Sequence, residues 1–463
     1  MNLHPTLGVP VARLSALRAW RALSPALRWG LAGAALLHAT AGHAEEWALD
    51  GGPTITLNAF AKYETQRNSN VCEDCQRIPS ASKDEIWGDQ LIPGQPYKTT
   101  QIDTLLFEPW LGVKADIGRG FTLSALLSQR WRNGEEDVPG FAFERNVALS
   151  HEDYGSLRIG AMTTRAWSIS DYPYGTNLGL SFVWAGSGAG YGMLTGAVRY
   201  TSRILEVFNG DLVLEGTYDG GNTGFKINRP RFYELYAQYH RGPLVVDAVA
   251  QVTRNGTPGA WGQAPFTGLT PNAADDSKLG SSGQAMDVVM ARYDLNSRLQ
   301  LSGGLRFNRW SGAYAVETVP GALAQWNNMF NVCWSSEVPN NCPSSNNLTP
   351  GYSARTTDMM AGARYTVGKW TTYGGVAYLG KGHTANPSDR AHSEASNWLL
   401  DGTLGESYEV VRGLKVYVAG GLYHYGHIGL APFSMPSNSS YTNVDSRVAQ
   451  NGNSVLLGVV YAF

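Results

Sequence analysis

The feature that most constrains this chain is an alternation of apolar and polar residues with a period of two. In the stretch TITLNAFAKYE, Ile55 and Leu57 alternate with Thr54 and Thr56. This period predicts β-strands with one apolar and one polar face. About sixteen such stretches follow one another, with no linker and no amphipathic helix between them. They lie near residues 54–66, 101–117, 120–133, 141–151, 156–164, 192–202, 210–219, 231–241, 243–254, 284–294, 297–310, 355–366, 369–381, 398–411, 413–425 and 453–463.

The connections between these predicted strands alternate between short and long. Turns such as 117–120 and 411–413 are tight, whereas the other connections are polar loops rich in Gly, Pro and Asn. A transmembrane barrel has this pattern, because its periplasmic turns are short and its outer loops long. We therefore expect an all-β fold, a transmembrane antiparallel β-barrel of sixteen strands. Eighteen strands fit the length equally well, because the large loops 255–283 and 312–354 have room for one more hairpin.

Aromatic residues near the ends of the predicted strands support a membrane barrel, since aromatic girdles mark both membrane interfaces. One stretch, 178–198, carries no charge over 21 residues, but six glycines make it a poor helix. We expect it to be a loop followed by the sixth strand. The predicted girdle residues are Tyr63, Trp131, Tyr200, Tyr218, Tyr293, Tyr365, Trp370, Tyr378, Trp398 and Tyr408.

The first 44 residues have the order of a secretory signal peptide. They contain four arginines and no acid, then the short apolar run WGLAGAALLHATA, then small residues before Glu45. The apolar run is too short to span a bilayer as a helix. We expect cleavage after Ala44, leaving the barrel as residues 45–463 with a formal charge of 32 − 38 = −6. This charge disfavours nucleic acid as a partner, which needs a basic face.

The four cysteines lie in two polar stretches of the exported chain. Cys72 and Cys75 form CEDC, and Cys333 and Cys342 end CWSSEVPNNC. In an exported protein such cysteines are expected to form disulfides, and we favour the two local pairs, although sequence leaves the connectivity open. The rival is a four-cysteine zinc site, which the spacing of the second pair disfavours. We expect no metal and no cofactor.

Several motifs carry a family resemblance. RNVALSHEDYGSLRIG (145–160) is similar to a strand, aromatic-Gly turn and strand of the general porins of Gram-negative outer membranes. VRYTSRILEVFNGDLVLEGTY (198–218), GESYEVVRGLKVYVAGGLYHYG (405–426) and SVLLGVVYAF (454–463) resemble further strands of that family, most closely in its beta-proteobacterial members. The resemblance implies a sixteen-strand homotrimeric diffusion channel of the bacterial outer membrane. Its implied partners are outer-membrane lipid, lipopolysaccharide, the barrel assembly machinery and small hydrophilic solutes.

A sixteen-strand barrel is wide enough for a water-filled lumen with a polar lining. In the porins that this chain resembles, the third long loop folds into the barrel and narrows it, and here that loop is 165–190. We expect Asp171, beside Tyr172 and Tyr174, to face basic residues of the early strands. The inward charged residues predicted from the alternation are Lys62, Lys114, Arg130, Arg132, Arg158, Arg306, Arg364, Glu108, Glu215, Glu234, Asp247, Asp358 and Asp401.

Two other function classes stay open from sequence. A substrate-specific channel, for sugars, organic acids or amino acids, would use a ladder of inward aromatic residues. An enzyme in a barrel would need a nucleophile and a base, but no Gly-x-Ser-x-Gly elbow and no HExxH motif occurs. We therefore expect no enzyme. The candidate ladder is Tyr236, Trp310, Tyr373, Tyr417, Tyr423 and Tyr425.

The last ten residues, SVLLGVVYAF, form the final predicted strand. Leu457, Val459, Tyr461 and Phe463 fall on one face, which we expect to meet lipid. In outer-membrane barrels a strand that ends in an aromatic residue resembles the signal read by the assembly machinery. This strand must also pair with the strand near 54–66 to close the barrel, because an open edge has no water to bond in a membrane.

Overall fold

The computed structural model describes residues 45–49, 52–69, 100–136, 143–171, 184, 188–190, 192–220, 231–254, 283–311, 354–384, 398–426 and 451–462. Within these ranges the chain is a set of antiparallel strands with one short helix, α3 (Arg165–Asp171). No helix among these residues has the length and apolar character needed to cross a bilayer. The four cysteines and Phe463 lie outside the described residues.

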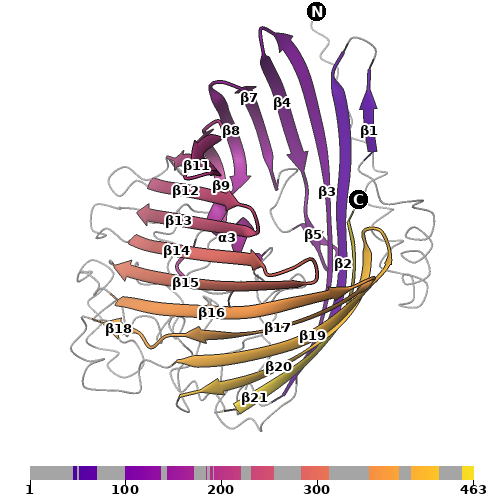
Figure 1. The fold of residues 1–463 in the computed structure, drawn as a ribbon, viewed down its shortest axis with the longest axis vertical. Coiled ribbons are helices and arrows are strands. Elements are labelled where there is room, and N and C mark those ends of the chain that lie inside the picture. Colours follow the sequence, from indigo (N-terminus) through magenta and orange to yellow (C-terminus); the bar gives the residue numbers. More distant parts are fainter. Residues whose placement is uncertain are drawn as a thin grey trace, which may run out of the picture. The chain divides into compact units, whose positions relative to one another are not determined.

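Sixteen strands form the wall of a closed barrel, as the sequence predicts (Figure 1). They are β2 (Thr54–Ser69), β3 (Thr100–Gly118), β4 (Phe121–Ser128), β7 (Arg145–His151), β8 (Gly155–Thr163), β9 (Met193–Thr201), β11 (Gly210–Asp219), β12 (Arg231–Arg241), β13 (Leu244–Arg254), β14 (Gly283–Asp294), β15 (Leu299–Ser311), β16 (Ala354–Val367), β17 (Trp370–Leu379), β19 (Leu399–Val411), β20 (Leu414–Tyr425) and β21 (Asn451–Ala462).

Each wall strand pairs with its neighbour along the chain, and the last pairs with the first. The closing seam joins β2 to β21 over ten register positions, from Phe60 opposite Ala462 to Ser69 opposite Asn453. Because β13 pairs directly with β14 and β15 with β16, the large loops add no strand to the wall between them. The count is therefore sixteen, and the eighteen-strand alternative is excluded.

Short strands pair with parts of several wall strands or with one another. β1 (Glu45–Ala48) pairs with the start of β2, β5 (Trp131–Arg132) pairs with β3 and with β6 (Glu135–Glu136), β10 (Leu205–Val207) pairs with β11, and β18 (His383–Thr384) pairs with β16. The sequence predicts a single strand over 120–133, but the wall breaks after Ser128 and resumes at Trp131. The β3–β4 turn has positive φ at three successive residues, of which Gly118 and Gly120 adopt it without strain, and Arg119 lies between them with a φ of 56°.

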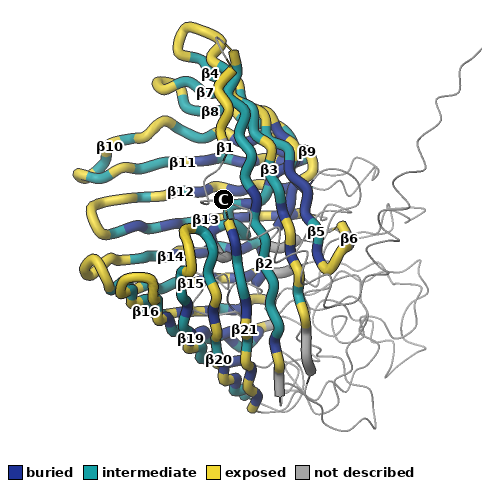
Figure 2. The backbone as a smooth tube through the Cα atoms, turned by 90° about the vertical axis from the view of Figure 1, so that its right-hand side faces the viewer, coloured by how far each residue is buried: buried dark blue, intermediate teal, exposed yellow. Residues whose placement is uncertain are grey.

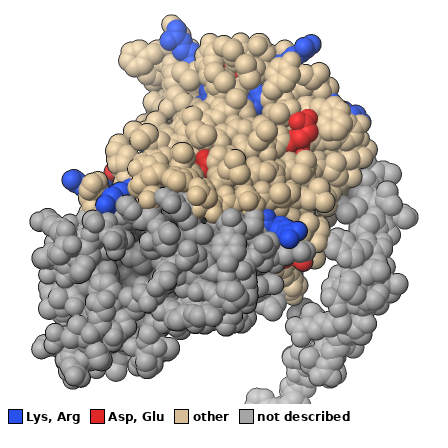
Figure 3. All heavy atoms as spheres, turned by 90° about the horizontal axis from the view of Figure 1, so that it is seen from below, with Lys and Arg blue, Asp and Glu red and all other residues tan. Residues whose placement is uncertain are grey.

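The two faces of the wall have opposite polarity, and the polar face is the buried one. On adjacent positions of β12, Glu234 is 2% exposed and Leu235 is 67% exposed. On β19, Asp401 is fully buried and Leu404 is 68% exposed. A water-soluble fold would bury the leucines, so this inversion indicates an outer surface in contact with lipid. Figure 2 shows that the short turns are the most exposed parts of the wall, and charged side chains are sparse over the described surface seen in Figure 3.

Aromatic residues cluster at both ends of the strands on the outer surface. Near the short turns, Trp370 packs against Tyr408 with ring centroids 4.7 Å apart. Near the long loops, Tyr218 packs against Tyr233 at 5.3 Å. These two bands lie where interfacial girdles lie in transmembrane barrels.

Candidate pore lining

The predicted inward charged residues all lie on the inner side of the wall. The nine that are buried are Glu108, Arg130, Arg132, Glu215, Glu234, Asp247, Arg306, Asp358 and Asp401, the three that are half-buried are Lys62, Arg158 and Arg364, and Lys114 is exposed. Charges of both signs therefore line the lumen. Many of them contact one another or a segment that lies inside the barrel.

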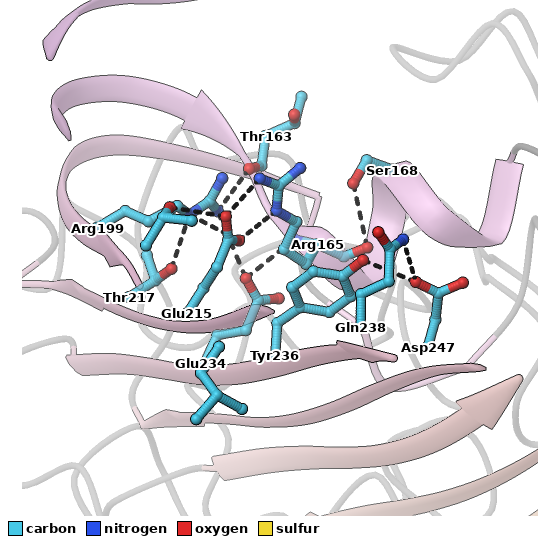
Figure 4. Close-up of polar contacts among 12 residues, drawn as sticks. Thr163, Arg165, Ser168, Arg199, Glu215, Thr217, Glu234, Tyr236, Gln238 and Asp247 are labelled. Carbon is cyan, nitrogen blue, oxygen red and sulfur yellow. Dashed lines mark hydrogen bonds and ion pairs between the residues drawn. The ribbon is translucent and has the colours of Figure 1, made fainter. Parts of the chain in front are cut away.

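Helix α3 follows β8 and is fixed to the wall at its first residues (Figure 4). Glu234 of β12 accepts the backbone N–H of Arg165 at 2.9 Å through Oε1 and that of Ala166 at 3.1 Å through Oε2. Thr164 caps the helix by accepting the N–H of Trp167 at 3.3 Å. A buried carboxylate from the wall thus satisfies two N–H groups at the start of the helix, which have no partner within it.

The side chain of Arg165 adds a second connection between α3 and the wall. Its guanidinium binds Glu215 of β11 through two hydrogen bonds, one of them from Nη2 to Oε1 at 2.7 Å. Burial alone would lower the pKa of Arg165, but the hydrogen bonds and negative charge of Glu215 hold it above its ordinary value. The arginine is therefore charged, and the pair is a fixed ionic contact.

Arg199 of β9 joins these acids to the strand that precedes the helix. Its Nη2 donates to the carbonyl of Thr163 at 2.9 Å and approaches Glu234 Oε1 at 3.4 Å, and its Nε donates to Thr217 at 2.8 Å. Sequence analysis did not single out this residue. The signal was available, because the alternation of β9 puts Arg199 on the buried side between Ala197 and Thr201.

The later part of the segment 165–190 contacts another part of the inner wall, at β15, three strands beyond β12. Arg306 of β15 donates from Nη1 to the carbonyl of Trp184 at 2.9 Å, and its guanidinium lies 4.4 Å from the Trp184 ring centroid. Arg306 is held by Asp358 of β16 at 2.9 Å. The N–H of Ala189 donates to Asn308 at 2.8 Å. Trp184 is fully buried, so this segment contacts the inside of the wall at both of its described ends.

Gly188 makes this close approach feasible. Its φ is +100°, and a Cβ at this position would lie 2.8 Å from the guanidinium carbon of Arg306. A larger residue would meet both the strained backbone conformation and the arginine. The contact therefore depends on a glycine in the sequence AGSGAG.

The predicted contact between Asp171 and the early basic residues falls partly outside the described structure. Asp171 ends α3, but its side chain is not described, and Tyr172 and Tyr174 lie outside the described residues. The guanidinium of Arg130 lies 5.3 Å from the ring centroid of Trp167, which belongs to α3, so the helix does lie beside one of these bases. Arg130 also approaches Glu108 at 3.7 Å.

The described rings of the candidate aromatic ladder lie against the wall. Tyr373, Tyr417 and Tyr423 are each 3% exposed. A Cβ on Gly458 of the neighbouring strand would lie 2.3 Å from the Tyr417 ring, which shows how closely the ring covers that strand. The Tyr417 hydroxyl donates to Glu64 Oε1 at 2.5 Å. Such rings present little face to a solute. Tyr236 is 8% exposed, and the side chains of Trp310 and Tyr425 are not described.

On the terminal strand, the outward face is only partly as predicted. Val455 and Leu457 are each 57% exposed, and Val459 is half-buried. Tyr461 pairs with Leu414 on the same face but is only 6% exposed. Its ring lies beside the β19–β20 turn, where a Cβ at Gly413 would be 3.7 Å from the ring, in ordinary contact, and 2.2 Å from the carbonyl oxygen of Ala462. Tyr461 is thus packed against protein.

No group of three or more His, Cys, Asp and Glu residues in the described part of the chain could hold a metal ion. Most of the buried acids bind arginines, backbone N–H groups or tyrosines, as Asp247 does with Tyr236 at 2.7 Å, whereas Asp401 accepts a hydrogen bond from Thr403 at 3.4 Å. The described inner wall is therefore a polar lining whose charged residues also hold the start of α3.

A closed sixteen-strand barrel with an apolar outside and a charged inside is the fold of the outer-membrane porins. No family model matches the chain, and no curated protein matches it by sequence. Among solved structures it resembles an anion-selective porin from Comamonas acidovorans, with a TM-score of 0.55, 13% identity, 89% of this chain covered and 100% of that chain. It resembles OmpT, an outer membrane protein of Vibrio cholerae, with a TM-score of 0.54, 12% identity and coverage of 91% and 100%. It also resembles Salmonella typhi OmpF, with a TM-score of 0.51, 13% identity and coverage of 90% and 100%.

Proposed function

We propose that this protein is a porin of the bacterial outer membrane, forming a water-filled channel for passive diffusion of ions and small hydrophilic solutes. The observation that carries the proposal is the charged inner wall of a closed sixteen-strand barrel, whose outer wall is apolar. A lumen lined by charges of both signs holds ordered water and favours polar solutes, and rings of charge set ion preference.

The segment 165–190 is the proposed constriction. Its described parts are bound to β11 and β12 at one end and to β15 at the other, so they occupy space inside the wall. Asp171, Tyr172 and Tyr174 belong to this segment and are proposed to line the narrow part of the channel. A net charge of −6 for residues 45–463 favours cations weakly through its field.

The remaining parts of the proposal come from the family resemblance and the sequence. They are a cleaved signal peptide over residues 1–44, a homotrimer, a surrounding of lipid and lipopolysaccharide, recognition of the last strand by the assembly machinery, and local disulfides. No enzymatic activity is proposed. The substrate-specific alternative has little support from the tyrosines described above, because they are buried and expose little surface to a solute.

The test is single-channel recording of the purified chain in planar bilayers, with insertion checked by protease protection. We expect stepwise conductance, with steps in groups of three for a trimer, and solute flux that rises linearly with concentration up to a size limit. Absence of conductance after verified insertion refutes the channel. Saturable block by one solute refutes general diffusion in favour of a substrate-specific channel.

A further inference from the structure

Arg292 of β14 is an inward arginine that sequence analysis did not single out. It follows Met290 on the buried side of the strand, whereas Val289 and Tyr293 are 52% and 43% exposed on the outer side. Its cross-strand partner on β15 is Ser302. Arg292 and Ser302 therefore lie side by side on the inner wall of the barrel.

Arg292 differs from the inward arginines that hold the proposed constriction segment. Arg165 is ion-paired with Glu215, and Arg306 with Asp358 at 2.9 Å. The side chain of Arg292 makes no hydrogen bond and no ion pair with the described residues. No contact of the described wall therefore neutralises its charge, and the guanidinium holds no segment in place.

Two polar atoms of this strand pair have no protein partner. Nε of Arg292 and Oγ of Ser302 are both shielded from solvent without a hydrogen bond to any described residue. Buried polar atoms nearly always have a partner, so two such atoms on directly opposed residues need an explanation. The flanking strands supply no polar side chain, because Val245 lies opposite Arg292 and Gly362 lies opposite Ser302. Only Nε of the guanidinium is shielded, so its two terminal nitrogens are open to the lumen.

The position of Arg292 follows from the contacts of Trp184. The Trp184 Nε1 donates to the sulfur of Met290 at 3.4 Å, and a Cβ on Gly304 would lie 3.0 Å from the Trp184 ring. Met290 and Gly304 are directly opposed, and Arg292 with Ser302 forms the next inward pair toward the short turns. A solute that passes Trp184 toward the short turns therefore meets Arg292 next along this part of the wall.

Two acids lie near Arg292 in the register of the wall. Asp247 of β13 is a diagonal neighbour and accepts the Tyr236 hydroxyl at 2.7 Å. Asp294, two residues further along β14, accepts the Gln300 amide at 2.7 Å. Neither acid is ion-paired with Arg292, and their charges keep the surrounding field from being broadly positive. An anion at Arg292 is therefore held by hydrogen bonds to the guanidinium fork rather than by a positive field.

We propose that Arg292 binds small oxyanions, carboxylates and phosphate, as they pass through the lumen. The guanidinium fork donates two parallel hydrogen bonds to two oxygens of one anion, whereas a spherical chloride ion offers no such match. This inference rests on the proposed function, because solutes reach Arg292 through the channel, and it names a solute class that the channel retains on the way.

The test records chloride currents through the purified full chain in planar bilayers while acetate or inorganic phosphate is added. We expect a partial, saturable fall in current with both anions and none with acetamide, the uncharged analogue of acetate. A block shared by both oxyanions differs from the block by one solute that would refute general diffusion.

Three variants assign the block to the fork. Arg292→Gln should raise the half-blocking concentration about tenfold or more, because hydrogen bonds to a charged group are lost. Arg292→Lys keeps the charge without the fork, so its half-blocking concentration should lie between those of the wild type and Arg292→Gln. The matched control is Arg298→Gln, in the exposed turn of the same hairpin, where salt screens the charge and the change should stay below about twofold.

Several results would overturn the site. These are a linear response to both anions, block by only one of them, an unchanged half-blocking concentration in Arg292→Gln, or an equal loss in Arg298→Gln. Block by Arg292→Lys at the wild-type concentration assigns the effect to charge and rejects the fork. A protein that conducts without saturable block rejects this site alone. If verified insertion gives no conductance, the channel is rejected, and line broadening of labelled acetate by the protein in micelles still decides the site, since Arg292→Gln should abolish it.

Discussion

The carboxylate of Glu234 should control how firmly the proposed constriction segment, 165–190, is held against the inner wall. It accepts the N–H groups of Arg165 and Ala166, and it also accepts the side-chain amide of Gln251 at 3.0 Å. In Glu234→Gln, one carboxylate oxygen becomes an NH₂ group that faces a donor. At least one hydrogen bond to a charged acceptor is lost, which costs about 1.5–3 kcal/mol.

This free-energy cost raises the fraction of molecules in which the start of α3 is detached from the wall. Since an equilibrium constant changes tenfold for each 1.4 kcal/mol, detachment becomes roughly 10- to 100-fold more frequent. We expect the amide hydrogens of α3 to exchange faster by that factor in hydrogen-exchange mass spectrometry. In single-channel recordings, the open-state current should become noisier, because a loosened helix moves in the conducting path.

The control for this variant is Asp401→Asn, which neutralises another fully buried inward carboxylate, on β19. Asp401 accepts a hydrogen bond from the Thr403 hydroxyl at 3.4 Å. The variant Asp401→Asn should leave the hydrogen exchange of α3 unchanged. Unchanged α3 exchange in Glu234→Gln, with the barrel still resistant to heat in detergent, would refute the reasoning. An equal effect in Asp401→Asn would show that loss of lumen charge in general is the cause.

The other predictions concern packing, selectivity and assembly. Gly458→Ala should overpack against Tyr417 and lower the unfolding temperature in detergent, by an amount equivalent to about 1–3 kcal/mol. Gly402→Ala has open space at its Cβ and should leave the unfolding temperature unchanged. Equal unfolding temperatures for the two variants would contradict the packing argument. Asp171→Asn should shift the reversal potential in a salt gradient toward anions, and an unchanged potential would remove Asp171 from the constriction. Deleting Phe463 should reduce the amount of heat-modifiable barrel in outer-membrane fractions, and normal assembly would remove its role as a signal.

The strands could be predicted because each one repeats a local pattern. The alternation in 243–254 and 297–310 is visible in any short window, and it fixes the face of Asp247 and Arg306 once the strand is known. The exclusion of eighteen strands depended on pairings between segments separated by large loops. Local patterns carry no information about those pairings.

The arrangement of the lumen was only partly readable from the sequence. The cap formed by Thr164 before a seven-residue helix is too short a signal to separate from a turn. The role of Arg199 depends on Glu234 and Thr163, which the barrel brings together from three different strands. The burial of Tyr373 likewise results from contact with Gly405 on the neighbouring strand, which alternation along one strand cannot reveal.

The seam between β2 and β21 sets the order of events in folding. Its partners, such as Phe60 and Ala462, are almost a full chain apart, whereas most other wall pairings join neighbouring segments. Closing so long a loop adds only about 0.6 kcal/mol per doubling of length, so the cost is mainly one of time. Until β21 is made, one edge of β2 presents unpaired backbone groups that another chain can join. The nascent barrel is therefore most vulnerable to aggregation while its last strand is still missing, and a factor that shields the edge of β2 would protect it.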